Sequence, residues 1–191
     1  MNKTKRKIFE TSMELFAKKG YEATSIEEIT SIVGVAKGTL YYHFSSKEEI
    51  FNFLVEEGIK LLKNSIEIKT AKLKNSIDKL KAVVLIQIKI IAKYEDFISI
   101  LLSELWRQEP RNKNCRRYAF EYIDVIENII SEGMKNNEII EGDSNVIAHG
   151  IFGFTCSTMF YKLSQNKEID IQKIYKELTK DFINNLEYNH I

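Results

Sequence analysis

Apolar residues recur every three or four positions along most of this 191-residue chain, and no stretch keeps a strict alternation of apolar and polar positions. The first spacing places apolar side chains on one face of an α-helix, whereas alternation would indicate a β-strand. The pattern therefore predicts an all-α protein of about nine helices.

The first part of the chain predicts three short helices. Gly20 is expected to end the first, and either Thr24 or Ser25 suits the cap of the second, with a glutamate three residues on. Gly34 then interrupts the pattern, which gives a helix, a tight turn and a helix. The expected limits are residues 3–19, 25–33 and 36–43.

A longer helix is expected after Phe44, because Ser45 with Glu48, or Ser46 with Glu49, matches the capping-box spacing. Its expected buried side is Ile50, Phe51, Leu54, Gly58, Leu61 and Leu62. A small domain of residues 1–46 thus passes without a flexible linker into a larger domain of residues 47–191. A continuous helix at this junction would transmit movement between the two domains.

The larger domain continues with about five further helices. Asp143 or Ser144 suits the cap of the fourth of these. Their apolar stripes run from Ile77 to Ile91, Phe97 to Trp106, Cys115 to Gly133, Val146 to Phe160 and Ile171 to Leu186.

The composition is that of a globular protein with a sizeable core: 44% of the residues are hydrophobic, and there are one proline and eight glycines. This excludes collagen-like, low-complexity and disordered chains. The two cysteines, Cys115 and Cys156, lack zinc-ligand spacing and are expected to be buried thiols in a reducing compartment. We expect no metal and no cofactor.

No segment has the pattern of a signal peptide or a bilayer span. Apolar residues near the amino terminus alternate with charges, and the longest uncharged stretch, residues 144–161, contains polar residues and glycines. We therefore expect a cytoplasmic protein without a membrane partner.

The net charge of +1 is unevenly distributed. Residues 1–47 contain eight basic and five acidic side chains, a local charge of +3, and the remainder carries −2. Because surface lysines are commonly just solvated, this excess is weak support for nucleic-acid binding by itself.

Residues 34–44 have the character of a DNA-recognition helix. Val35, Leu40 and Phe44 are suitable anchors for such a helix. Small or polar residues stand where a helix start would meet bases and phosphates in the major groove, namely Ala36, Lys37, Gly38 and Thr39. Hydrogen-bond donors suited to a phosphate-facing rim follow at Tyr41, Tyr42, His43 and Lys47.

The same region resembles the TetR family of bacterial transcriptional regulators over about residues 5–54. The resemblance is carried by LFAKKGY at 15–21, ATSIEEI at 23–29, GVAKGTLYYHF at 34–44 and SKEE at 46–49. It implies an all-α homodimer that binds a near-palindromic operator on double-stranded DNA and is released by a small molecule. It further implies base or phosphate contacts from Lys37, Gly38 and Thr39, and backbone contacts from Thr24 or Ser25, Tyr41, Tyr42, His43 and Lys47.

Several of these residues have a structural alternative. Lys37 and Thr39 could be solvated bystanders, and one of the two adjacent tyrosines is expected to turn toward the core. His43 could be a buried, hydrogen-bonded histidine. The basic segment from Lys3 to Lys7 is either a DNA-contacting arm or a disordered tail.

Two sets of residues in the larger domain suggest further contacts. Small residues and a broad apolar face on the last two helices suit a four-helix dimer interface, or else the monomer core: Val146, Gly150, Gly153, Ser157, Ile171, Tyr175, Leu178 and Phe182. Aromatic residues suit the lining of a site for an apolar or amphipathic effector, although most aromatics here are expected in the core: Phe97, Trp106, Tyr118, Tyr122 and Phe152.

The sequence therefore predicts a ligand-responsive repressor and not an enzyme. An all-helical enzyme or carrier is the alternative from another class, but the chain has three histidines, no phosphate-cradling glycine loop and no evident catalytic set. A non-specific architectural DNA binder would be expected to carry a stronger positive charge.

Overall fold

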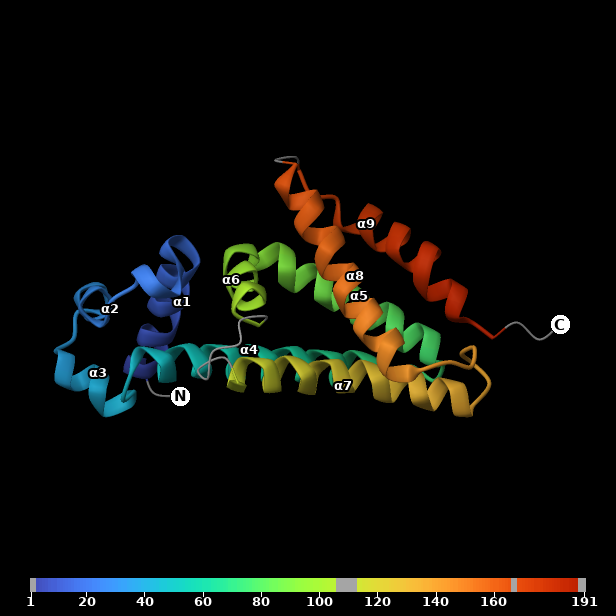
Figure 1. Cartoon of the computed structure of the whole chain (residues 1–191), viewed down its shortest axis with the longest axis horizontal. Coiled ribbons are helices and arrows are strands. Elements are labelled where there is room, and N and C mark those ends of the chain that lie inside the picture. The colour runs from blue at the N-terminus through green and yellow to red at the C-terminus, as the bar shows by residue number, and fades with distance from the viewer. Residues whose placement is uncertain (1–2, 106–112, 166–167, 189–191) are drawn as a thin grey trace. The chain divides into compact units, whose positions relative to one another are not determined.

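The computed structural model describes residues 3–105, 113–165 and 168–188, and in these ranges the regular elements are helices. The bounds are α1 (Lys3–Ala23), α2 (Ile26–Val33), α3 (Lys37–His43), α4 (Lys47–Thr70), α5 (Ser76–Lys93), α6 (Glu95–Leu105), α7 (Lys113–Lys135), α8 (Ser144–Ser164) and α9 (Ile171–Leu178). A π-helical turn, Thr179–Ile183, and a 3₁₀ turn, Asn184–Leu186, follow. The all-α prediction is confirmed (Figure 1).

The chain forms two compact units. The first comprises Met1–Ile59 with Asp96–Ala119, and the second comprises Lys60–Glu95 with Phe120–Ile191, each within the ranges described. Helix α4 is continuous from the first unit into the second, as the absence of a linker in the sequence predicts. Among the described residues, no helix combines the length and the apolar character needed to cross a bilayer.

The break in α1 lies at the expected glycine. Gly20 has φ 82° and ψ 166°, a conformation that side chains disfavour, so the regular helix stops there. The redirected chain buries Tyr21, whose ring packs 5.5 Å from that of Phe16 and 5.2 Å from that of Phe51. These rings belong to the core of the first unit.

The start of α4 follows the predicted capping pattern. The Ser46 hydroxyl accepts a hydrogen bond from the Glu49 amide at 3.0 Å. The Glu49 carboxylate in turn accepts from both the amide and the hydroxyl of Ser45, each at 2.6 Å, and these hydrogen bonds lower the pKa of Glu49. The reciprocal bonds fix the point where α4 begins.

The predicted buried side of α4 is wrong at two positions. Gly58 is exposed, and 64% of the Leu61 surface is accessible. The buried stripe instead continues through Val55, Ile59, Leu62 and Ile66, with steps of four, three and four residues. Leu61 lies well away from a stripe with this spacing, whereas Gly58 lies at its edge and has no side chain to bury there.

In the second unit, α5 packs against α8 and α9. All five residues of the predicted α5 stripe are buried: Ile77, Leu80, Val84, Ile88 and Ile91. Asp143 is the cap of α8, and its carboxylate accepts from the amides of Asn145 and Val146 at 3.0 and 3.1 Å. Cys115 and Cys156 are buried free thiols as predicted, and burial raises their pKa to about 12 and about 11.

Candidate nucleic-acid interface

Local hydrogen bonds set the direction of α2 and the turn after it. The Ser25 hydroxyl accepts from the Glu28 amide at 3.1 Å and caps the first turn. At the other end Gly34 takes a left-handed conformation, φ 76°, and its amide donates to the Thr30 carbonyl at 2.9 Å. The turn predicted from Ser25 and Gly34 is therefore present.

Helix α3 is held by one side of its surface. Leu40 is fully buried and Phe44, directly after the helix, is 2% exposed, whereas Val35 is half-buried. The Phe44 ring lies 5.3 Å from that of Phe53 in α4. The anchors predicted at Leu40 and Phe44 are thus in place.

The start of α3 is open to solvent within this unit. Ala36, Lys37, Gly38 and Thr39 are all exposed, and a β-carbon added at Gly38 would meet no atom within 4 Å. A backbone with this much space around it can approach another molecule closely. These are the residues for which base contacts are predicted.

Both tyrosines of α3 point outward. Tyr41 is 48% exposed and Tyr42 is 84% exposed, so the expectation that one of them turns into the core is wrong. His43 is half-buried, with its ring 5.1 Å from that of Tyr42. Leu40 is the one buried residue of this seven-residue helix, and neither tyrosine shares its inward face.

Lys47 has a structural role that the sequence did not reveal. Its ammonium donates to the carbonyl oxygens of Tyr21, Glu22 and Thr24 at 2.9, 3.2 and 3.0 Å. An ammonium has three N–H donors, and three carbonyls occupy them here. The carbonyls belong to the junction between α1 and α2, so Lys47 ties the start of α4 to that junction instead of pointing to a phosphate rim.

Thr24 and Ser25, offered as alternatives by the sequence, have different surroundings. Thr24 is 1% exposed and its hydroxyl donates to the Gly20 carbonyl at 2.9 Å, so it is a buried turn residue and not a surface contact. Ser25 is exposed at the start of α2. Of the two, Ser25 alone is accessible, and its predicted contact with DNA stays a prediction.

The described part of the basic amino-terminal segment, from Lys3 onward, is the first turn of α1 and not a disordered tail. Arg6 pairs with Glu10 one turn later at 2.8 Å. The ammonium of Lys5 lies 4.2 Å from the Phe53 ring centre and 5.0 Å from that of Phe44, at distances typical of cation–π contacts. Part of this positive charge therefore serves contacts within the unit.

Two ion pairs join α2 to its neighbours. Glu27 pairs with Lys37 of α3, and Glu28 pairs with Lys19 of α1. The hydrogen bond between Lys37 and Glu27 raises the pKa of the lysine and lowers that of the glutamate. Glu27 is a residue that sequence reasoning missed, because its partner is ten positions away and only the turn brings the two together.

The aromatic residues expected at an effector site belong to both units. In the first unit, Phe97 is buried with its ring 6.4 Å from that of Phe51. Burial and a hydrogen bond with Glu56 raise the pKa of the half-buried Tyr118. Trp106 lies outside the described residues.

In the second unit Tyr122 and Phe152 are in contact, with ring centres 5.9 Å apart. The buried Tyr122 hydroxyl donates to the side-chain oxygen Oε1 of Gln87 at 3.1 Å. Burial raises the pKa of Tyr122. The Gln87 amide donates to the Phe152 backbone carbonyl at 3.2 Å and to Cys156 Sγ at 3.3 Å. Gln87 was not identified from the sequence as a functional or structural residue. The available signal was a glutamine within the apolar stripe of α5.

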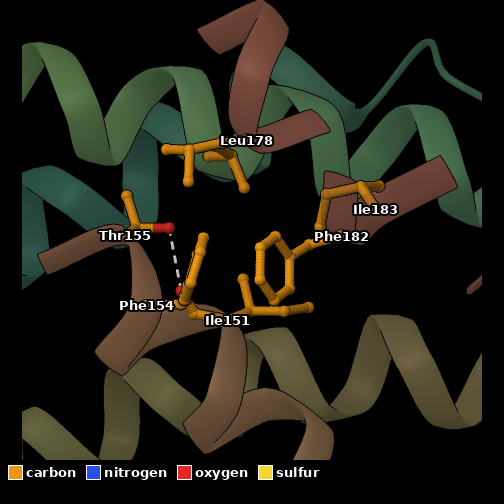
Figure 2. A pocket seen from close by; sticks show the side chains of 7 residues that line it. Ile151, Phe154, Thr155, Leu178, Phe182 and Ile183 are labelled. Carbon is orange, nitrogen blue, oxygen red and sulfur yellow. Dashed lines mark hydrogen bonds between the residues drawn. The ribbon is translucent and has the colours of Figure 1, made fainter. Parts of the chain in front are cut away.

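The second unit contains a small apolar cavity (Figure 2). It has a volume of about 10 Å³, which is roughly the space of one water molecule. Its walls come from α5, α8, α9 and the turn after α9: Val84, Ile151, Phe154, Thr155, Leu178, Phe182 and Ile183. At this volume the cavity has no room for a molecule larger than water.

Most of the residues predicted for a dimer interface are accessible. Val146 is 65% exposed, Phe182 is 42% exposed, and Gly150, Gly153 and Ser157 are exposed on the same side of α8. A β-carbon added at either glycine would meet no atom within 4 Å. Ile171 and Tyr175 are half-buried.

The prediction for Leu178 differs from this pattern. It is 4% exposed and lines the cavity inside the protomer (Figure 2), so it is a core residue and not part of an exposed face. The apolar face of α9 is wide, and some of its residues pack into the core of the protomer. Leu178 is one of these.

Comparisons with known proteins agree with this architecture. Residues 8–54 match the sequence profile of bacterial regulatory proteins of the tetR family. The HTH-type transcriptional regulator YerO of Bacillus subtilis, whose role is uncharacterised, is 30% identical over 91% of this chain. The chain spans 61% of the length of YerO.

Solved structures extend the likeness to nearly the whole chain. A Clostridium perfringens protein assigned as a fatty acid metabolism regulator is 35% identical, with a TM-score of 0.86 over 96% of this chain and 100% of that one. The regulator FadR of Bacillus subtilis, solved with stearoyl-CoA, shares the fold with a TM-score of 0.86 at 21% identity, over 95% and 99% of the two chains. The chain belongs to the TetR family of bacterial transcriptional regulators.

The role of Lys47 can be tested by Lys47→Met, which keeps the apolar stem and removes the ammonium. We expect the free energy of unfolding to fall by about 1–3 kcal/mol, because three carbonyls lose a charged donor. Urea unfolding measures this, with Lys18→Met, at an exposed position of α1, as a control that should change stability by less than about 0.5 kcal/mol. Unchanged stability together with weakened DNA binding would instead place Lys47 at the phosphate rim.

Proposed function

We propose that this protein is a homodimeric transcriptional repressor that binds a near-palindromic operator and releases it when a small amphipathic effector binds. The observation that carries the proposal is the exposed start of α3, held from behind by Leu40 and Phe44. A helix supported in this way can enter the major groove, with Lys37, Gly38 and Thr39 toward the bases.

The rim of this surface supplies backbone contacts. Ser25, Tyr41 and Tyr42 are exposed hydrogen-bond donors on the elements beside or within α3, and His43 is half-buried at its end. Contacts of this kind fix the register of a protein on DNA without reading its sequence. In a dimer, two copies of α3 must lie about 34–36 Å apart, or a multiple of that distance, to reach two half-sites on one side of B-DNA.

The exposed face of α8 supports dimerisation. Val146, Gly150, Gly153 and Ser157 form an uncharged strip in which the glycines would allow another helix to approach closely. Phe182, after α9, adds exposed apolar surface beside Phe154, with ring centres 3.5 Å apart. A two-fold axis would place this face against its own copy, as in most homodimers.

The effector is proposed to belong to the long-chain acyl-CoA class. One similar structure carries stearoyl-CoA, and a more closely related one is assigned to fatty acid metabolism. An acyl chain would replace apolar contacts in the second unit, and its binding energy would favour a conformation in which the small cavity is open. Helix α4 is continuous between the units and is the proposed route from effector to α3.

DNA binding is tested with the double variant Lys37→Ala and Thr39→Ala, on a duplex selected by the protein from a randomised pool. We expect at least about 30-fold weaker binding by fluorescence anisotropy, because two base contacts are lost and each costs about 1–3 kcal/mol. Ser65→Ala with Lys69→Ala, at exposed positions of α4, removes the same groups and should bind normally. Unchanged affinity in the α3 variant, or equal affinity of the wild type for every duplex, would contradict the proposal.

Dimerisation is tested with Gly153→Glu. The new carboxylate would be buried without a partner at the proposed interface, at a cost of about 3–5 kcal/mol. Analytical ultracentrifugation should then report a monomer of unchanged helix content. Gly58→Glu, at a similarly open position on α4, should remain dimeric. A Gly153→Glu dimer as tight as the wild type would exclude this face as the interface.

The effector class is tested by adding stearoyl-CoA to the protein bound to its selected duplex. We expect the affinity for DNA to fall by about 5-fold to 150-fold, the usual range of coupling between two sites. Coenzyme A without an acyl chain is the control and should leave the complex intact. Retention of DNA at saturating stearoyl-CoA would rule out this ligand class.

A further inference from the structure

The two adjacent glutamates in the first turn of α2 hold lysines from different helices. Glu27 binds Lys37 of α3, and Glu28 binds Lys19 of α1. Successive residues on an α-helix point about 100° apart, so the two carboxylates reach in different directions. Only the pair of Glu27 involves a residue that the proposed function places at the bases.

We propose that Glu27 is a positioning residue that raises sequence specificity by competing with DNA phosphates for Lys37. This inference rests on the proposed function, because it assumes that α3 enters the major groove. It assigns to an acidic side chain a part in DNA recognition that a search for basic residues would not find.

The pair is accessible to DNA. The Lys37 and Glu27 side chains are 52% and 64% exposed, so a DNA molecule can reach the ammonium without any change in the packing of the unit. Leu40 keeps α3 in place, and the ammonium of Lys37 moves on a flexible four-carbon stem. Without a restraint, that stem would allow Lys37 to reach a phosphate on DNA of any sequence.

Glu27 changes the free energy of a phosphate contact by Lys37 more than that of a base contact. A phosphate that binds the ammonium comes close to the Glu27 carboxylate, and the two negative charges repel each other. The acceptor atoms of a guanine edge are neutral, and an ammonium has three donors, so Lys37 can contact a base while it stays paired with Glu27. The Glu27 carboxylate thus weakens the phosphate contact of Lys37, which does not depend on the DNA sequence.

The expected effect is modest and measurable. An exposed ion pair typically changes an equilibrium by about twofold to fivefold. In the wild type, Glu27 keeps Lys37 from neutralising a phosphate, so Lys37 does not release the cation condensed on that phosphate. Its removal should therefore steepen the dependence of log affinity on log salt on non-specific DNA by about 0.9 for each Lys37 that gains a phosphate, or about 1.8 for a dimer.

The experiment compares the wild type, Glu27→Gln and Glu28→Gln on the selected duplex and on a shuffled duplex between about 50 and 200 mM salt. The two variants make the same charge change at adjacent positions. We expect E27Q to bind the shuffled duplex about twofold to fivefold tighter with a steeper slope, and the selected duplex with a smaller gain. E28Q should match the wild type in specificity and slope.

A second comparison isolates the pair itself. In a Lys37→Met background, Glu27→Gln should no longer alter the ratio of affinities for the two duplexes, because its partner is gone. Urea unfolding of each variant checks that the fold is retained. A Glu27→Gln ratio and slope equal to those of the wild type, or an equal change in E28Q, would overturn the role of Glu27. Failure of the wild type to prefer the selected duplex would overturn the proposed function instead.

Discussion

A seven-residue helix has little stability of its own in water, so α3 depends on the burial of one of its sides. Leu40 within the helix and Phe44 directly after it provide that burial, and Phe44 packs on Phe53 of α4. The capped α2 and the left-handed Gly34 fix the angle at which α3 leaves the turn. Because the inner side does all the anchoring, the outer side is free to carry small and polar residues.

Several of the positive charges in the first unit are paired within that unit. Lys47 binds three carbonyls, while Arg6, Lys19 and Lys37 are in ion pairs. A paired cation that binds a DNA phosphate does so in competition with its carboxylate partner, so the free energy gained is a difference between two contacts. Discrimination between DNA sequences depends on that difference more than on the local excess of positive charge.

The second unit combines a packed apolar core with one satisfied polar network. Gln87 connects Tyr122, Cys156 and the Phe152 carbonyl, so its amide is buried at little cost. The small apolar cavity in the same unit has a volume of about 10 Å³, roughly the space of one water molecule. In the proposed function an effector stabilises a more open form of this core, and α4, which runs without a break into the first unit, is the proposed route.

The sequence alone determined the helices, the turn and the exposed start of α3, because these depend on local spacing, caps and glycines such as Ser25, Gly34 and Ser46. It also identified the family from the residues around that turn. Tertiary structure decided what each charged or apolar group contacts. In the folded chain Lys47 binds backbone carbonyls, and Thr24 and Leu178 are buried. Gly58 and Leu61 are exposed. Periodicity identifies the face of a helix on which a side chain lies, but the neighbour that meets that face is set by contacts between residues distant in the sequence. The pair of Glu27 and Lys37 exists for the same reason, since only the folded turn brings the two charges together.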